Sequence, residues 1–236
     1  MTVVLIVRHG LTSTTGKALT GWLPGISLDD RGRAQAEAVA ERLARLPLAA
    51  VVSSPLERCV QTATAIASGQ ADPMQVLTDD RLGECKYGDW TGQPLRKLAR
   101  EPLWRVVQAH PSAVTFPGPD GESMSGMQQR AVTAIRDWND KLGKDATYLV
   151  CSHGDVIKAI LADALGMHLD MSQRIQVDPC SLSIIRYTTL RPFVLRVNDT
   201  GTDAAALSGL VHAPATAGAK AEADAQIGGG AGGADS

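Results

Sequence analysis

The stretch VVLIVRHGLTSTTGK, from Val3 to Lys17, decides the fold. Five apolar residues, most of them β-branched, run directly into Arg8, His9 and Gly10, and such a run is typical of a buried parallel strand. Buried strands usually end in turn residues, whereas this one ends in a cation and an imidazole. Because ligands bind at the carboxyl ends of strands in open α/β sheets, Arg8 and His9 are candidates for chemistry. A surface arginine beside a capping histidine is the alternative.

The length and charge of the chain restrict its class. Its 236 residues fit one domain that is large enough to bury a core. The formal charge is −2, without a block of like charge, so we expect no nucleic-acid partner. The first apolar run has no basic segment before it and stops at Arg8, so we expect neither a secretion signal nor a membrane span. These features favour a cytoplasmic protein.

Strand and helix patterns alternate along the chain and predict an α/β fold. Apolar residues recur at helical spacing from Leu28 to Leu46, from Leu95 to Val107, from Met124 to Leu142 and from Asp155 to Gly166. The motif SPLE predicts Ser54 as N-cap of a helix that starts at Pro55, with Glu57 completing a capping box. Further strands are predicted at Leu48–Ser54, Met74–Leu77 and Thr147–His153, and SLSIIRYT and PFVLRV as a late pair at a sheet edge.

Two histidines stand in the same context. His9 in LIVRHG and His153 in YLVCSHG each follow an apolar strand and precede a glycine, so we expect the two strand ends to face one site. Arg58 lies in the first turn of the helix after the second strand, beside unpaired helical N–H groups. Guanidinium groups offer paired donors to phosphate oxygens, so Arg8, Arg58 and the two imidazoles predict an anion site. A solvated helix arginine is the alternative for Arg58.

These residues stand in motifs that resemble the histidine phosphatase superfamily, the phosphoglycerate mutase-like enzymes. The motifs VRHGLT, GISLDDRGRAQA, SSPLERCVQTA, RLGECKYGDWTG, FPGPDGESM and VCSHGDVIK stand in the order of that family's landmarks and span Val3 to Lys158, with the weaker RVNDTG extending to about residue 200. The resemblance implies a three-layer α/β/α sandwich with a mostly parallel central sheet, in a catalytic domain of residues 1–203. An Ala- and Gly-rich tail, residues 204–236, is predicted to be disordered.

The resemblance also implies roles for single residues. His9 matches the nucleophile, Glu84 the proton donor, and Arg8, Arg58 and His153 the phosphate clamps. Thr15 stands where relatives often carry Asn, and its hydroxyl can still donate to phosphate. A neutral imidazole can attack phosphorus to form a phosphohistidine while cations and helix amides stabilise the oxygens. This chemistry needs no metal and no other cofactor. A surface glutamate is the alternative for Glu84, which must hold a proton near neutral pH to act as an acid.

Four cysteines, Cys59, Cys85, Cys151 and Cys180, are scattered without a CxxC pair, which favours free thiols over a disulfide framework or a zinc site. Three of them lie within two positions of a candidate site residue, which leaves oxidative control open. We interpret them as small buried packing residues. The basic stretch from Arg96 to Arg105 either guides an anionic substrate or is a solvated helix face.

We therefore predict a metal-independent phosphomonoester hydrolase that forms a phosphohistidine at His9 and acts on a small phosphorylated metabolite. A phosphomutase is the nearest alternative, although the segment from Thr91 to Pro119 is short and lacks the Trp-Arg-Arg-Ser-Tyr run of the cofactor-dependent mutase branch. Two alternatives from other classes are a catalytically inactive phospho-ligand binding module and a metallohydrolase with His9, His153 and Glu84 as ligands. We expect no membrane partner, and the sequence leaves a homo-oligomer and the physiological substrate open.

Overall fold

The computed structural model describes residues 1–201, and within them six strands form one sheet in the order β3-β2-β4-β1-β5-β6. The strands β1 to β4 are parallel, whereas β5 is antiparallel to both of its neighbours. The sheet is therefore mostly parallel, as predicted, with the two late strands together at one side. The strands are β1 (Thr2–Arg8), β2 (Val51–Ser53), β3 (Val76–Thr78), β4 (Thr147–Ser152), β5 (Leu182–Tyr187) and β6 (Pro192–Asp199).

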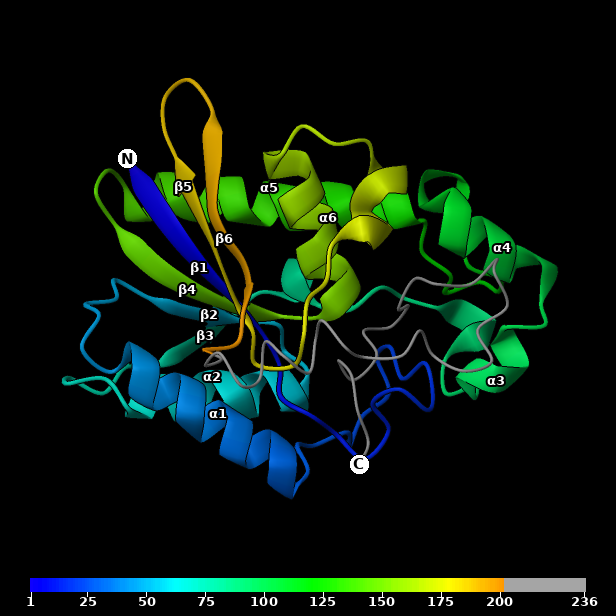
Figure 1. Cartoon of the computed structure of the whole chain (residues 1–236), viewed down its shortest axis with the longest axis horizontal. Helices are drawn as coiled ribbons and strands as arrows, with labels where there is room; N and C mark the ends of the chain where they lie inside the picture. The colour runs from blue at the N-terminus through cyan, green and yellow to red at the C-terminus, as the bar shows by residue number, and fades with distance from the viewer. Residues whose placement is uncertain (202–236) are drawn as a thin grey trace.

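Helices cover both faces of this sheet (Figure 1). On one face lie α1 (Asp30–Leu43) and α2 (Glu57–Ser68), and on the other lie α5 (Met124–Leu142) and α6 (Gly154–Ala164). The alternation of side chains along β1 explains the two layers, because successive residues of a strand point to opposite faces. Leu5 and Val7 belong to the core with α1 and α2, and Val4 and Ile6 to the core with α5 and α6. The predicted three-layer α/β/α fold is confirmed.

The segment from Leu95 to Val107 forms two helices instead of the single helix that its apolar spacing predicts. These are α3 (Leu95–Leu98) and α4 (Pro102–Ala109), which lie beyond one end of the sheet in Figure 1. Pro102 has no N–H with which to continue a helix from the preceding turn, and it occupies the first position of α4. Short 3-10 turns complete the described fold at Asp80–Leu82, Gly88–Trp90, Pro111–Ala113 and Leu169–Arg174.

Helix α2 begins later than the motif SPLE predicts. Its N-cap is Leu56 and its first residue is Glu57, so the predictions of Ser54 as N-cap and of a start at Pro55 are wrong. The Ser54 hydroxyl accepts a hydrogen bond from the Leu56 N–H at 3.3 Å and lies 2.8 Å from Nε2 of His153. The Ser54 hydroxyl thus forms its hydrogen bonds with Leu56 and His153, and Ser54 itself lies before the N-cap of α2. The strands β2 and β3 are likewise shorter or shifted relative to the apolar runs that predicted them.

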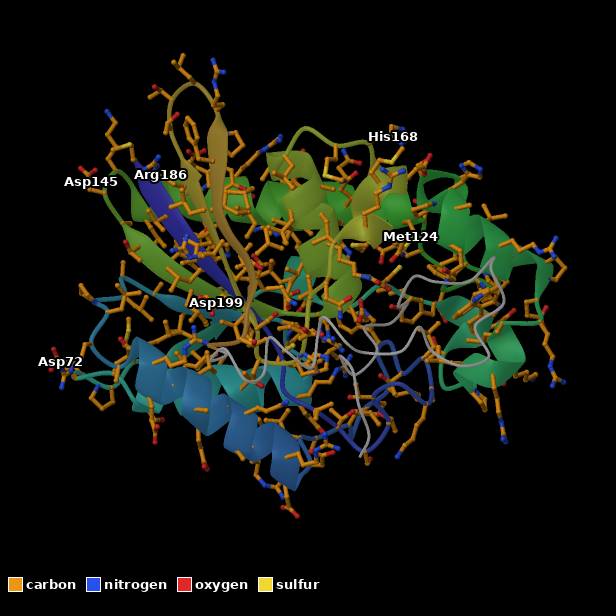
Figure 2. All side chains as sticks on the ribbon, viewed as in Figure 1. Asp72, Met124, Asp145, His168, Arg186 and Asp199 are labelled. Carbon is orange, nitrogen blue, oxygen red and sulfur yellow. The ribbon has the colours of Figure 1, made fainter. Side chains whose placement is uncertain are left out.

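The far edge of the sheet is attached to the helical layer beneath it. Asp199, labelled in Figure 2, ends β6 and accepts a hydrogen bond from Nη2 of Arg42 on α1 at 2.9 Å.

The predicted disordered tail, residues 204–236, lies outside the described residues. Up to residue 201, the structure contains no helix that is both long and apolar enough to span a membrane.

Candidate active site

The carboxyl ends of three neighbouring strands carry the candidate residues. Strand β4 lies between β1 and β2, and its register pairs Ser152 with Arg8 and Cys151 with Ser53. His9 follows β1, Arg58 is the second residue of α2 after β2, and His153 lies between β4 and α6. The strand order therefore brings together residues that are far apart in the sequence, as the two matching HG contexts predict.

The loop after β1 is held against both helices of its layer. The Gly10 N–H donates to the hydroxyl of Thr62 on α2 at 3.1 Å, and a Cβ atom on Gly32 of α1 would lie only 2.0 Å from the carbonyl oxygen of Leu11. A side chain at Gly32 would force this helix away from the loop. The close approach of the two backbones therefore fixes the position of His9.

The His9 imidazole is buried and held in one tautomer. Its Nδ1 lies 2.8 Å from the carbonyl oxygen of Gly10, which can only accept a hydrogen bond, so Nδ1 carries the proton. Burial lowers the pKa of His9 well below its ordinary value, and the charges of Arg58 and Arg8 lower it further. The ring is consequently neutral at physiological pH, with a lone pair on Nε2.

Arg58 connects the two histidines. Its Nε lies 3.3 Å from Nε2 of His9, and its Nη2 lies 3.2 Å from Nδ1 of His153 and 2.9 Å from the carbonyl oxygen of Gly21. Because arginine only donates, both imidazole nitrogens accept. The remaining nitrogen of His153 therefore carries the proton and donates to Ser54 Oγ at 2.8 Å. Burial, followed by the nearby cationic groups, lowers the pKa of His153 well below its ordinary value.

Arg8 and Thr15 occupy different positions relative to this cluster. Arg8 is buried, its Nη1 donates to the carbonyl oxygen of Val177 at 2.8 Å, and its charge acts on His9. The Thr15 hydroxyl lies 2.9 Å from that of Thr12 and accepts from the Thr12 N–H at 3.0 Å, within a turn of the loop. None of the described hydrogen bonds joins Thr15 to the histidines or arginines of the cluster, so its contact with phosphate stays a prediction.

Glu84 is buried beside His153, with Oε2 at 3.9 Å from Nδ1 of that histidine. Burial raises the pKa of Glu84 to about 7, and the negative charge of Asp155 adds to the increase, while Arg58 opposes it. With a neutral imidazole and a carboxyl group that holds a proton below pH 7, this contact is not an ion pair. The arrangement provides a proton donor at neutral pH, and the alternative of a surface glutamate is wrong.

The backbone of Glu84 is fixed by two side chains that the sequence did not single out. Its carbonyl oxygen accepts from Nε1 of Trp22 at 2.5 Å and from Nη2 of Arg130 at 3.0 Å. Arg130 also donates to the carbonyl oxygen of Gly83 at 2.8 Å and forms an ion pair with Glu122 at 2.6 Å. Arg130 therefore anchors the Glu84 loop to α5, although on the sequence it is one polar residue of an amphipathic helix.

The remaining candidates are buried in the core or lie at the surface, and one of them, Cys59, packs against His153 with Sγ at 3.4 Å from Nε2. All four cysteines are free and buried, and burial raises the pKa of Cys85, Cys151 and Cys180. This supports their interpretation as packing residues. Figure 2 shows His168 at the periphery of the molecule. Its Nδ1 lies 3.2 Å from Oδ2 of Asp170. The basic residues between Arg96 and Arg105 are exposed. Among residues 1–201, His, Cys, Asp and Glu form no group of three suited to a metal ion.

Comparison with known proteins agrees with this geometry. Phosphoserine phosphatase 1 of Hydrogenobacter thermophilus is 29% identical over 208 residues, covering 85% of this chain and 93% of that protein. Glucosyl-3-phosphoglycerate phosphatase of Mycolicibacterium vanbaalenii is 33% identical over 176 residues, covering 71% and 76%. The solved structure of Bacillus stearothermophilus YhfR matches with a TM-score of 0.75 at 26% identity, covering 84% of this chain and 98% of that chain.

The family model of the histidine phosphatase superfamily (branch 1) matches residues 4–200, which is nearly the whole described chain. The match includes each of the strand ends that carry His9, Arg58 and His153, together with the Glu84 loop. With two phosphatases among its relatives, the chain is an enzyme of the phosphatase type that works through a histidine. The chain belongs to the histidine phosphatase superfamily, branch 1.

Proposed function

We propose that the enzyme hydrolyses phosphomonoesters of small metabolites through a phosphohistidine at Nε2 of His9, without a metal. The observation that carries this proposal is the tautomer of His9. The Gly10 carbonyl oxygen accepts a hydrogen bond from the Nδ1–H of His9, and the Nε2 lone pair faces the guanidinium of Arg58. A nucleophile that is neutral and already oriented toward the phosphate-binding cation needs no general base to activate it.

In the first step, Nε2 of His9 attacks phosphorus in line with the leaving oxygen, and the P–O ester bond breaks as the P–N bond forms. Arg58 and Arg8 donate to the phosphoryl oxygens, whose negative charge is shared between them. His153 joins them as a donor only when its Nδ1, which accepts from Arg58 in the free site, takes up a proton. The carboxyl group of Glu84 gives its proton to the leaving oxygen, so that an alcohol departs instead of an alkoxide. Glu84 is left as a carboxylate.

In the second step, water attacks phosphorus on the phosphohistidine and passes its proton to the Glu84 carboxylate. The P–N bond breaks, inorganic phosphate forms, and His9 and Glu84 return to their starting protonation states. The raised pKa of Glu84, about 7, suits a group that acts first as acid and then as base at neutral pH. Burial is the main cause of that pKa.

The organic part of the substrate lies, in this proposal, beside the Glu84 loop. A cavity of about 340 Å³ is lined there by Trp22, Leu23, Lys86, Gly88, Thr91 and Asp120. Trp22 donates to the Glu84 backbone, and the Lys86 ammonium lies 5.5 Å from the centre of the Trp22 ring. A cavity of this size with one cation, one carboxylate and one hydroxyl suits a small polar alcohol. Phosphoserine and glucosyl-3-phosphoglycerate, which the relatives' names specify, are the first substrates to assay.

The four free thiols favour a cytoplasmic setting for this enzyme, because the cytoplasm keeps thiols reduced.

The proposed intermediate can be trapped by rapid acid-free quenching with a ³²P-labelled substrate. We expect a labelled protein that loses its label in acid and keeps it in alkali, as a phosphoramidate does. The His9→Ala variant should show no label and no turnover, with an unchanged melting temperature. His168→Ala, which changes an exposed histidine of the same chain, is the matched control and should label normally. Label that survives acid, or that persists in His9→Ala, would contradict the proposal.

A further inference from the structure

A second buried carboxylate stands behind the proposed acid, and the mechanism above does not use it. Asp155 lies in the first turn of α6, two residues after His153, and is only 2% exposed. The hydroxyl of Tyr87 donates to Oδ2 of Asp155 at 3.0 Å. Tyr87 itself is buried and comes three residues after Glu84 in the same loop. Asp155 is thus linked to the acid's loop by a hydrogen bond and to the phosphate clamp by the chain.

The surroundings of the two carboxyl groups differ. Asp155 accepts a hydrogen bond from the Tyr87 hydroxyl, and its charge attracts the cations of Arg8 and Lys158. Burial raises the pKa of Tyr87 well above its ordinary value, so the phenol keeps its proton and remains a donor. The carboxyl group of Glu84 receives one backbone N–H, that of Cys85 at 2.9 Å. The two carboxyl groups therefore lie in unequal settings, one beside a phenol and two cations and the other beside a single backbone N–H.

We propose that Asp155 is a positioning residue for the acid: its buried charge, held by Tyr87, keeps the proton on Glu84 while the enzyme waits for substrate. This inference rests on the proposed function, since it concerns the protonation of the same acid. Asp155 touches neither the substrate nor the reacting atoms in this proposal. It acts on Glu84 through its charge, by the repulsion that a second carboxylate exerts in a low-dielectric interior.

Several other groups face Glu84, and their charges and hydrogen bonds also change its pKa. Arg8 from β1 and Arg58 from α2 favour the carboxylate and lower the pKa of Glu84, as does the Cys85 N–H. The charges of Asp155 on α6 and of Glu84 raise the pKa of Tyr87, and Arg130 on α5 faces the loop through the Glu84 carbonyl oxygen. His153 is neutral. Apart from burial, Asp155 is the largest cause of the raised pKa.

The test compares pH profiles of kcat/KM for the whole chain, with an alkyl phosphate whose leaving alcohol needs a proton. Activity should fall on the basic side as Glu84 loses its proton, and this basic limb should be absent in Glu84→Gln. In Asp155→Asn, which keeps an acceptor for the Tyr87 hydroxyl, the limb should move to lower pH. At pH 8.5 we expect kcat/KM to be about fivefold to tenfold below that of the wild type, with little change at pH 5.5.

Two controls separate this effect from a loss of structure. Asp163→Asn changes a partly exposed aspartate on the same helix, which pairs with Arg136 at 3.3 Å, and should leave the limb in place. With p-nitrophenyl phosphate, whose leaving group needs no proton, Asp155→Asn should show no such shift. If Asp155→Asn does not fold, Tyr87→Phe removes only the donor to Asp155 and should move the limb in the same direction by a smaller amount.

The outcomes distinguish this inference from the proposed function. A basic limb that is lost in Glu84→Gln but unmoved in a folded Asp155→Asn overturns the role of Asp155 and leaves Glu84 as the acid. A basic limb that persists unchanged in Glu84→Gln overturns the role of Glu84 itself. A uniform loss of activity at every pH in Asp155→Asn, with no movement of the limb, assigns Asp155 to the support of Arg8 and also overturns the inference.

Discussion

The Nε of Arg58 lies 3.3 Å from Nε2 of His9, although the two residues belong to different strand–helix units. The Nε–H of Arg58 is directed at the lone pair of His9 Nε2, so the proposed nucleophile and the proposed phosphate-binding cation are in direct contact. In the mechanism that we propose, a phosphoryl group would contact Arg58 as it comes within reach of His9. The proposed attacking atom and the group proposed to stabilise the transition state are therefore positioned by a single contact.

This relationship predicts a strong and specific loss on changing Arg58. Arg58→Ala should lower kcat/KM by ~10²–10³-fold, the usual cost of removing a donor to the developing charge. Arg58→Lys should recover little of it, because an ammonium is a point charge and lacks the rigid planar fork whose Nε and Nη2 are directed at His9 and His153. Steady-state kinetics with p-nitrophenyl phosphate measure both variants. Arg45→Ala, at an exposed position, should behave as the wild type, and full activity in Arg58→Lys would argue for a simple point charge.

A second prediction concerns the dependence on the leaving group. Glu84→Gln cannot give up a proton, so it should lower kcat for alkyl phosphates by ~10²–10⁴-fold. It should lower kcat much less for p-nitrophenyl phosphate, because p-nitrophenolate leaves without a proton. The comparison of the two substrates in one variant cancels any general loss of binding. Equal losses on both would assign Glu84 to binding or to structure.

The buried acid should also leave a signature in stability. The pKa of Glu84 is raised from 4.5 to about 7 in the folded state. The protonated carboxyl group therefore adds its full contribution to the free energy of unfolding below pH 4.5, and this contribution is lost as the pH rises through 7. Glu84→Gln escapes this loss. Its free energy of unfolding should exceed that of the wild type by ~3 kcal/mol at pH 8, with a difference that shrinks toward pH 5.

Urea unfolding of both proteins across that pH range measures this difference. Glu41→Gln, at an exposed position on α1, is the control and should show no growing difference with pH. A Glu84→Gln variant that is less stable than the wild type at pH 8 would show that the carboxyl group is ionised and stabilised there.

The choice between phosphatase and mutase depends on what receives the phosphoryl group from the proposed phosphohistidine at His9. A mutase must retain its product and exclude water, which needs an enclosure over the site. The segment from Thr91 to Pro119 supplies the short helices α3 and α4 and one 3-10 turn, with exposed basic residues between Arg96 and Arg105. With 3-phosphoglycerate and a bisphosphoglycerate primer we expect at most inorganic phosphate and little 2-phosphoglycerate, measured by ³¹P NMR. Isomerisation faster than phosphate release would make the enzyme a mutase.

The sequence predicted the parts of the fold whose patterns are local and repeated. Apolar runs gave β1 and β4, and helical spacing over many residues gave α1, α5 and α6. The predicted start of α2 is wrong because a serine can either cap a helix or form a hydrogen bond with a histidine. The sequence does not show that Nε2 of His153 lies 2.8 Å from Oγ of Ser54. The break between α3 and α4 depends on one proline whose effect outweighed the apolar spacing.

The candidate site divides in the same way. His9, Arg58 and His153 directly follow strands or begin helices, so their positions could be inferred once the strands were recognised. The positions of the residues that support Glu84 could not be inferred from the sequence. Trp22 and Arg130 meet at the Glu84 carbonyl oxygen from a loop and from α5, and only the packing of the two helical layers reveals this. Residues that position others carry no motif, because their task is defined by a neighbour that is distant in the sequence.

The place of β4 in the sheet has a consequence during synthesis of the protein. This strand lies between β1 and β2, yet it begins at Thr147, long after β2 has ended at Ser53. A nascent chain that has already emerged with His9, Arg58 and Glu84 still lacks the strand that sets their spacing. His9 and Arg58 take their observed spacing from β4, which pairs with the strands before each of them. Translation must therefore have passed Ser152, the last residue of β4, before the two side chains can take the positions that the structure shows.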